Sequence, residues 1–468
     1  MKYFISFFFT VFLSWGLFAQ AGYRIDFTIK NYDRDTALLA YKYGNQQFVS
    51  DTLTAQTPGH FVFEGTDTIP YGMYLLVLQP KNRILEFIID RGDQHFSVFA
   101  DAKDLSQPAT YLHSSSNAIF QEYVRFMMGL RQKAALIRQE ILIQDSLKNT
   151  QRKNELILAY EQLNQQVEQY QDKFIHENAG TFPALVVQSI REVKVPEFSG
   201  SPETVLKKRY DYYRYHYFDN IDFSDERLLY TNFYSQKVLD YVNKIIPQVP
   251  DTLIYELDNL LQKLEAAPKI HRYFLVTFLT QYGNSHEVGF DAIFVHLVNK
   301  YVKTGILQDI DEDKKAILLR NADLLEPVLI GKIAPNITLY EEDGSAHSIY
   351  DVDKDYTVLY FWGPECGYCK RAAPDLVKFY KAFKDRVAVI TICNQLGKDS
   401  YKCWDSVKEH EFNDMINLAD PDNHSHFQTK FFVRMTPTIY ILDKEKRIIT
   451  KGILTKDLKE VMKRILNE

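Results

Sequence analysis

Alternation of apolar and polar residues dominates the chain from residue 22 to about residue 110. Between residues 23 and 30, Tyr, Ile, Phe and Ile alternate with Arg, Asp, Thr and Lys, which is the period of a strand with one buried face. Turn-forming pairs such as Gly44-Asn45 and Pro58-Gly59 separate the apolar runs that follow. These runs cover residues 37–43, 61–63, 73–78, 85–89 and 96–99. The spacing predicts a small antiparallel sandwich or barrel, and we expect a β-sandwich-like domain over residues 22–110.

Helical periodicity replaces the strand pattern from residue 111 to about residue 330. Apolar residues recur at positions 120, 123, 124, 127 and 130, which share one face of a helix. The stretch 132–172 is rich in Gln, Glu and Lys and predicts a long antiparallel helical pair with a solvated face. Further helices are expected over residues 203–218, 228–246, 252–265, 270–282, 287–303 and 312–324. We therefore expect an all-α domain over residues 111–330.

Strand-like and helix-like segments alternate in residues 331–468. Apolar strand patterns lie at residues 356–362, 387–392 and 438–442, with helical composition between them. This predicts a C-terminal α/β domain, so the expected fold class is multidomain: a sandwich, a helical domain and an α/β domain. Hydrophobic residues make up 46% of the chain and the net charge is -6, which fits a globular protein and gives no electrostatic case for nucleic acid.

The first 21 residues have the composition of a secretory signal peptide. Lys2 supplies a basic start, residues 4–18 are mostly apolar, and Ala19-Gln20-Ala21 fits a cleavage site for signal peptidase. The apolar stretch is too short for an ordinary transmembrane helix, and no later segment is long and apolar enough to span a bilayer. We expect a periplasmic or secreted protein without a stable membrane span.

The candidate chemistry lies in the last third of the chain, which holds all four cysteines. Cys366-Gly-Tyr-Cys369 follows the apolar strand pattern of residues 356–362 and precedes a helix-like segment, residues 370–381. A thiol at a strand-to-helix junction lies at the positive end of the helix dipole, which stabilises its thiolate. The second thiol, one helical turn away, is placed to attack a mixed disulfide formed by the first. The pattern predicts dithiol exchange, with Cys366 as nucleophile and Cys369 as resolving thiol.

The other two cysteines leave several alternatives open. A lone CxxC can be half of a zinc site, but Cys393 and Cys403 do not form the second close-set pair that zinc ribbons use. They are expected to be a local disulfide, a second redox pair or two unpaired thiols, one of them buried.

Histidine gives no sign of a metal site. His216 and His296 lie in aromatic helical surroundings without ligands at metal-binding spacing, so we expect packing or structural hydrogen bonds. His424 and His426 are expected in a surface loop. We predict no metal and no cofactor.

The segment from Phe361 to Lys370 resembles the active-site segment of the thioredoxin superfamily. Pro374 and Thr436-Pro437 stand where that family has its helix-kinking proline and its cis-proline loop. The resemblance implies a thioredoxin fold, a loop of Thr436 and Pro437 that pairs with substrate backbone, and Trp362 beside the dithiol as part of the substrate-binding site.

The resemblance extends over the whole chain. Ile333-Ala-Pro is similar to the lead-in of periplasmic thioredoxin-like reductases and of peroxiredoxins, and residues 211–229 and 289–301 resemble helical segments of one family. The chain resembles secreted thioredoxin-like (TlpA/ResA-like) thiol–disulfide oxidoreductases of Bacteroidota, in which the two upstream domains have no known function.

Some residues depart from the family's pattern. Glu365 replaces the usual aromatic residue before the nucleophile, and its carboxylate should raise the pKa of Cys366. Glu365 and Tyr368 are the expected pKa-tuning residues. Tyr360 and Ala372 stand where relatives keep a carboxylate, so no internal base is evident for the resolving thiol.

Together these features predict an extracytoplasmic oxidoreductase that acts on protein disulfides, as a reductant supplied by an unidentified electron donor. One alternative is a binding protein whose upstream domains recognise a partner and whose redox module is accessory. Another is a thiol peroxidase, but the Pro-x-x-x-Thr/Ser-x-x-Cys pattern of peroxiredoxins is missing before Cys366.

Overall fold

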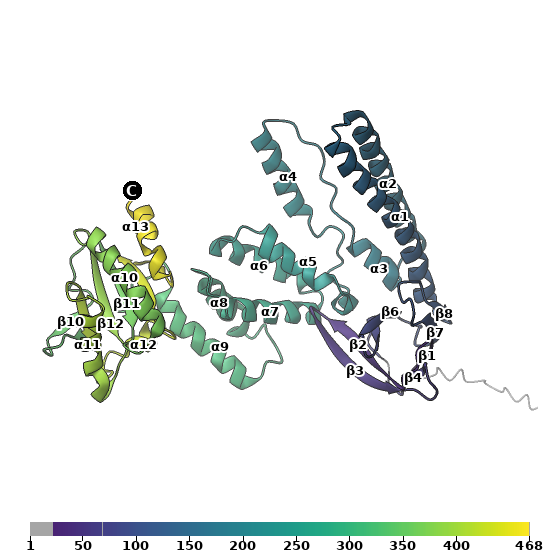
Figure 1. The fold of residues 1–468 in the computed structure, drawn as a ribbon. Coiled ribbons are helices and arrows are strands. Elements are labelled where there is room, and N and C mark those ends of the chain that lie inside the picture. The colour runs from purple at the N-terminus through teal and green to yellow at the C-terminus, as the bar shows by residue number, and fades with distance from the viewer. Residues whose placement is uncertain (1–21, 68, 468) are drawn as a thin grey trace, which may run out of the picture. The chain divides into compact units, whose positions relative to one another are not determined.

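The computed structural model describes residues 22–67 and 69–467, and the predicted signal peptide lies outside this part of the chain. The chain forms two compact units that meet in the sequence between residues 245 and 246 (Figure 1). The helices of the predicted middle domain are shared between the units, and the predicted domain boundaries at residues 110 and 330 stay predictions. Within the described residues, no helix has both the length and the apolar character that crossing a membrane requires.

The first unit begins with two four-stranded sheets, in the orders β4-β1-β7-β8 and β3-β2-β5-β6. Their strands are β1 (Tyr23–Lys30), β2 (Thr36–Tyr43), β3 (Gln46–Thr54), β4 (His60–Gly65), β5 (Gly72–Leu78), β6 (Arg83–Ile89), β7 (His95–Asp101) and β8 (Thr110–Leu112). Alternate residues of β1, namely Ile25, Phe27 and Ile29, enter one core shared by both sheets, which confirms the sandwich. Strand β1 pairs antiparallel with β4 but parallel with β7, so this sheet is mixed and not wholly antiparallel as predicted.

Strand β3 was not predicted because it has no buried face. Of its nine residues only Leu53 is buried. An edge strand exposed on both faces needs no alternation of apolar residues, so its sequence carries no period of two. The preceding turn at Gly44 and Asn45 leads the chain back from β2, with which β3 pairs along its full length.

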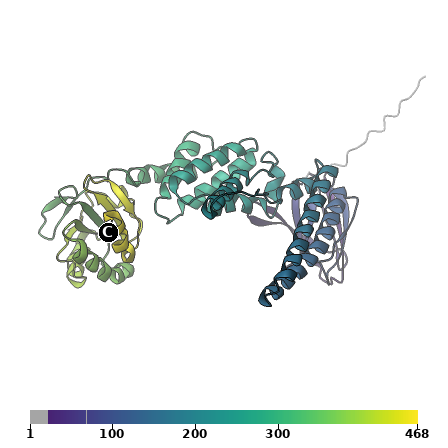
Figure 2. The ribbon, with the colours of Figure 1, turned by 90° about the horizontal axis from the view of Figure 1, so that it is seen from above.

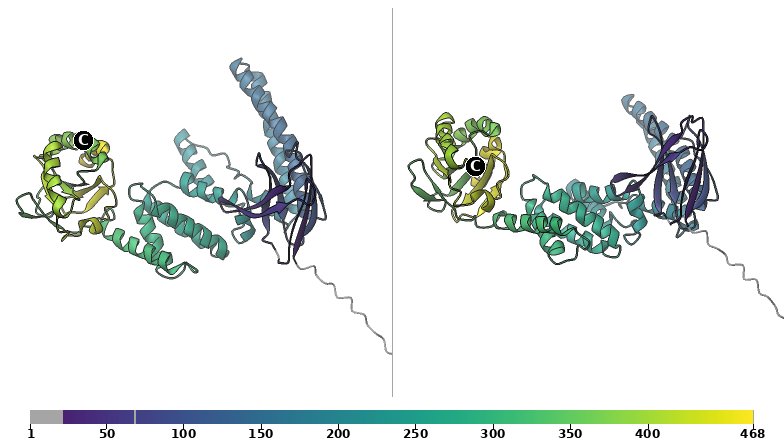
Figure 3. Two further views of the ribbon diagram at one scale, coloured as in Figure 1. Left: turned by 60° about the horizontal axis from the view of Figure 1, so that its bottom comes forward. Right: turned by 90° about the horizontal axis from the view of Figure 1, so that it is seen from below.

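The predicted helical pair is present as α1 (Ser115–Ser146) and α2 (Thr150–Glu177), which lie side by side (Figure 2). Rings of the two helices contact in antiparallel order, with centroid distances of 3.6 Å between Phe126 and Tyr170 and 5.1 Å between Tyr123 and Phe174. The base of the pair lies against the strands (Figure 3), where the buried Asn117 amide bonds both backbone groups of one β6 residue. The unit continues with α3 (Phe182–Ser189), α4 (Pro202–His216) and α5 (Tyr234–Asp240).

Two predicted helices are interrupted. The segment 228–246 is a 3-10 turn at Glu226–Tyr230, then α5, then a π turn at Tyr241–Ile245. The break lies at Thr231, whose hydroxyl donates a hydrogen bond to the Leu228 carbonyl at 2.7 Å and accepts one from the Tyr234 N–H at 3.3 Å. The segment 287–303 similarly begins only at α8 (Asp291–Leu297) and ends in a π turn at Val298–Val302.

The second unit contains four helices followed by a seven-stranded sheet in the order β10-β9-β13-β12-β11-β14-β15. The helices are α6 (Pro250–Leu264), α7 (Pro268–Gly283), α8 and α9 (Glu312–Leu325). The strands are β9 (Thr338–Tyr340), β10 (Ala346–Ser348), β11 (Tyr356–Trp362), β12 (Val387–Cys393), β13 (Ile416–Ala419), β14 (Thr438–Asp443) and β15 (Ile448–Lys451).

Strand β11 is central, parallel to β12 and antiparallel to β14. Its alternate residues enter two separate cores: Tyr360 and Trp362 lie in one, and Leu359 and Phe361 in the other. Burial on both faces explains the unbroken apolar run in the sequence. The helices that alternate with the strands from β11 onward are α10 (Gly367–Phe383), α11 (Tyr401–Glu409), α12 (Phe427–Lys430) and α13 (Leu458–Leu466). The domain has the predicted thioredoxin-like α/β fold.

Candidate redox site at the end of strand β11

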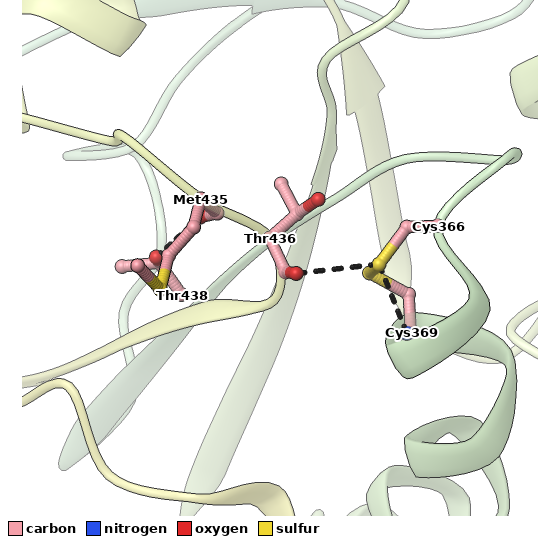
Figure 4. The surroundings of a disulfide bond; sticks show 5 residues. All are labelled: Cys366, Cys369, Met435, Thr436 and Thr438. Carbon is pink, nitrogen blue, oxygen red and sulfur yellow. Dashed lines mark hydrogen bonds between the residues drawn. A yellow bond between two sulfur atoms is a disulfide. The ribbon is translucent and has the colours of Figure 1, made fainter. Parts of the chain in front are cut away.

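The dithiol lies where the sequence predicted it, between the end of β11 and the start of α10. Cys366 is the N-cap residue of α10, and its Sγ accepts a hydrogen bond from the Cys369 N–H at 3.0 Å (Figure 4). The two residues form a disulfide with a Cα–Cα distance of 5.2 Å. A helix N-terminus carries partial positive charge, so in the reduced protein this position stabilises a thiolate on Cys366.

The two sulfur-bearing residues differ in exposure. Cys366 is half-buried, whereas Cys369 is only 1% exposed. An incoming disulfide can therefore approach Cys366 more readily than Cys369. This asymmetry is what a nucleophile followed by a resolving thiol requires.

The loop before β14 lies against the dithiol. The peptide bond between Thr436 and Pro437 is cis, and the Thr436 carbonyl oxygen is 3.3 Å from Cys366 Sγ (Figure 4). At this distance a reduced Cys366 thiol can donate a hydrogen bond to the carbonyl. Met435 beside it is 61% exposed, and its carbonyl accepts a hydrogen bond from the Thr438 hydroxyl at 2.7 Å. The pairing of Thr436 and Pro437 with substrate backbone stays a prediction.

Trp362 does not have the exposure that a substrate-binding residue needs. Its side chain is 0% exposed and belongs to the same core as Cys369. As the last residue of β11 it points inward, because alternate residues of this strand fill that core. Trp362 therefore has a packing position in the core below Cys369, and a part in substrate binding stays a prediction.

The two expected pKa-tuning residues are both exposed. The Glu365 side chain is 74% exposed, and its Oε1 is 3.0 Å from Lys402 Nζ. The hydrogen bond with Glu365 raises the pKa of Lys402. Tyr368 is 72% exposed, with the Arg371 guanidinium 4.5 Å from the centroid of its ring. The sequence did not point to Lys402, since it lies 37 residues from Glu365 in no recognisable spacing.

The other two cysteines are paired. Cys393 and Cys403 form a disulfide with a Cα–Cα distance of 6.0 Å, and both are almost fully buried. Cys393 ends β12 directly beside Trp362 in the strand register. Of the alternatives left open by the sequence, the bond excludes the two unpaired thiols and fits both a local disulfide and a second redox pair. In the part of the chain that the structure describes, no cluster of three metal-ligating side chains occurs.

Two of the histidines that the sequence singled out lie at hydrogen-bond distance from an aspartate, and the other two lie in a loop. His216 Nδ1 is 2.6 Å from Asp219 Oδ2, and His296 Nε2 is 3.0 Å from Asp258. His424 and His426 lie in the loop between β13 and α12, as expected. Tyr360, which replaces an acidic residue of the relatives, is fully buried, and burial raises its pKa. It is therefore no base at neutral pH.

His410, whose ring centroid is 5.9 Å from that of Trp362, should make the stability of this domain depend on pH. Burial lowers the pKa of His410 below 6.5. The unfolded chain then binds a proton more readily, so the free energy of unfolding should fall as the pH drops below about 6.5. Denaturant titrations between pH 7.5 and 5 should show that the free energy of unfolding falls less steeply in His410→Gln than in the wild type. His424→Gln, at an exposed site, should leave the fall unchanged; equal slopes in all three proteins would contradict the prediction.

Comparisons with known proteins agree with this geometry. Residues 330–451 match the model of the AhpC/TSA family, and residues 149–322 and 23–120 match two families described as domains of unknown function, DUF5106 and DUF4369. A thioredoxin-like protein of Haemophilus influenzae is 29% identical over 129 residues, which cover 25% of this chain and 67% of that protein. The thiol-disulfide oxidoreductase ResA of Geobacillus thermodenitrificans is 25% identical over 144 residues, 30% of this chain and 79% of the relative.

Solved structures from Bacteroides are also similar. A thioredoxin-like protein of Bacteroides caccae is 18% identical with a TM-score of 0.46, covering 60% of this chain and all of its own. The thioredoxin domain of a thiol-disulfide oxidoreductase of Bacteroides vulgatus is 23% identical with a TM-score of 0.28, covering 30% of this chain and 98% of its own.

The resemblance expected from the sequence motifs is thereby confirmed. The C-terminal domain is thioredoxin-like and similar to thiol-disulfide oxidoreductases, with two further domains of unknown function before it. These similarities support a thioredoxin-like redox function.

Proposed function

We propose that this protein is an extracytoplasmic thiol–disulfide oxidoreductase that reduces disulfides of other proteins. One observation carries the proposal: a half-buried Cys366 caps α10, is bonded to a buried Cys369, and lies 3.3 Å from the Thr436 carbonyl. The extracytoplasmic location rests on the signal-peptide composition of residues 1–21.

The exchange would proceed in two displacements. The Cys366 thiolate attacks one sulfur of the substrate disulfide, a mixed disulfide forms, and the departing substrate thiolate takes up a proton. Cys369 then loses its proton and attacks Cys366 Sγ, which releases the second substrate thiol and leaves the Cys366–Cys369 disulfide. Two electrons have passed to the substrate, and an external dithiol donor must return them. The substrate thiolate or water accepts the Cys369 proton, because Tyr360 and Ala372 supply no base.

The chemistry around Cys366 favours a polypeptide substrate. Exposed Met435 and Tyr368 flank the dithiol, and the backbone of Thr436 faces Cys366. A strand-like substrate segment could bond the loop backbone while its disulfide meets Cys366. The negative charge of Glu365 disfavours the Cys366 thiolate, which favours a reducing dithiol, whereas the positive charge of Lys402 counteracts that of Glu365. The reduction potential of the dithiol measures the net effect of the two charges.

The Cys369→Ala variant of the full chain tests the proposal. Without the resolving thiol, mixed disulfides between Cys366 and client proteins should accumulate in the periplasm of the native host and be released by reductant. Non-reducing electrophoresis with mass spectrometry should map them to Cys366. The matched control is Cys366→Ala with Cys369→Ala, which should trap nothing.

The same variants separate the alternatives. If clients bind the double variant as well as they bind Cys369→Ala, the upstream domains are binding domains and the dithiol is accessory. The AhpC/TSA match keeps a thiol peroxidase as a second candidate. Faster oxidation of the reduced wild type by hydrogen peroxide than by a protein disulfide would favour the peroxidase and contradict the proposal.

A further inference from the structure

Lys402 connects the second disulfide to the loop that carries the nucleophile. It lies in the first turn of α11, and its Nζ is 3.0 Å from Glu365 Oε1 and 3.5 Å from Asp399 Oδ1. Glu365 directly precedes Cys366, so its carboxylate is the negative charge nearest in the chain to the nucleophile. Other charged residues near in the chain to the dithiol or to its facing loop are Lys370, Arg371 and Arg434.

The second disulfide joins the start of α11 to the end of β12. Ser400, the N-cap residue of α11, makes no side-chain hydrogen bond to the helix. Cys403, one residue after Lys402, is instead bonded to Cys393 at the end of β12, and the two are 0% and 2% exposed. Strand β12 is paired with β11, whose last residue lies beside Cys393. The disulfide therefore links the end of β12, beside the end of β11, covalently to the helix turn that bears Lys402.

We propose that Lys402 is a positioning residue for the exchange reaction: held by the Cys393–Cys403 disulfide, it neutralises Glu365 and so reduces the repulsion between Glu365 and the Cys366 thiolate. The inference rests on the proposed function, since it concerns the reactivity of the same thiol. An ammonium group at hydrogen-bond distance has the opposite sign to the carboxylate and so weakens its field at nearby groups. Glu365 thus destabilises the Cys366 thiolate, and Lys402 limits that destabilisation.

Alkylation of Cys366 by iodoacetamide, followed against pH, tests the proposal. The Cys369→Ala background leaves Cys366 as the free thiol, and mass spectrometry checks that the second disulfide is intact. Lys402→Gln should raise the midpoint, the pH at which alkylation of Cys366 reaches half of its maximal rate. Below that pH, alkylation should be slower by about two- to threefold, as expected for one exposed charge pair. The effect should shrink in 1 M salt. Lys408→Gln removes a lysine from the same helix, where its partner is Glu342, and should change nothing.

A double-mutant cycle shows whether Lys402 acts through Glu365. Glu365→Gln alone should lower the midpoint, and Lys402→Gln should then have little further effect. Cys393→Ala with Cys403→Ala should reproduce the shift caused by Lys402→Gln and add nothing to it. If that cysteine variant fails to fold, the Lys402 and Glu365 arms still decide.

Two results would overturn the proposal: no shift in Lys402→Gln, or the same shift with and without Glu365. Neither result bears on whether Cys366 traps clients, so the positioning role can fail while the proposed function stands. Conversely, a shift of the alkylation midpoint that depends on Glu365, without any trapped client, would support the electrostatic role of Lys402 and contradict the proposed function in protein-disulfide exchange.

Discussion

Cys366→Ser is expected to abolish catalysed disulfide exchange, so that the rate of insulin reduction in the presence of dithiothreitol falls to the rate with dithiothreitol alone. A serine hydroxyl does not ionise near neutral pH, so the helix N-terminus has no thiolate to stabilise. The substitution removes one sulfur atom from a half-buried position and should leave the fold unchanged.

Cys369→Ala is the informative partner of this variant. It retains the nucleophile, so it should still open a small disulfide reagent once per molecule and then stop as a mixed disulfide. If Cys366→Ser retains wild-type exchange, or if alkylation of the reduced protein occurs first at Cys369, the assignment of the nucleophile is wrong. The second disulfide would then have to be considered as the reactive pair.

Trp362→Ala is expected to cause the largest loss of stability, about 3–5 kcal/mol in the free energy of unfolding of the C-terminal domain. Trp362 is among the largest fully buried side chains, and its ring packs edge-on against Phe412 at 5.6 Å between centroids. Replacing it by Ala leaves a cavity beneath Cys369 that the surrounding sheet and helices can fill only in part. Urea denaturation followed by circular dichroism measures the loss.

Trp404 supplies the matched control. It is only half-buried at the edge of the same core, so Trp404→Ala should cost clearly less stability. Trp362→Phe should recover much of the loss because it restores most of the buried ring. A loss below about 1 kcal/mol in Trp362→Ala, well under the usual cost of removing a buried Trp, would show that the core does not depend on this ring. An increase in KM for a protein disulfide without loss of stability would support the predicted role of Trp362 in substrate binding.

The sequence predicted elements wherever burial leaves a regular trace. Strand β1 has one buried face and alternates, and β11 has two buried faces and reads as a continuous apolar run. Strand β3 has almost no buried residue and left no pattern. The interruption of the helix near Thr231 was also invisible, because a threonine hydroxyl bonds nearby backbone groups in this way only when the local backbone turns toward it.

The same distinction holds at the candidate site. Cys366, Cys369, Thr436 and Pro437 could be named from the sequence because their chemistry depends on short spacing and on a strand-to-helix junction. The burial of Trp362 could not be read, since the continuous apolar run of β11 does not tell whether the end of the strand borders a groove or a core.

The amino-acid sequence by itself determined the location of the dithiol, the α/β pattern around it and the absence of cysteines from the first 365 residues, all of which are local properties of the chain. The tertiary structure alone decided that Cys393 bonds Cys403 and that Lys402 meets Glu365. Both contacts join segments that are apart in the sequence, and their geometry depends on how the start of α11 packs beside the ends of β11 and β12. Neither disulfide geometry nor the pairing of distant charges is written in residue spacing.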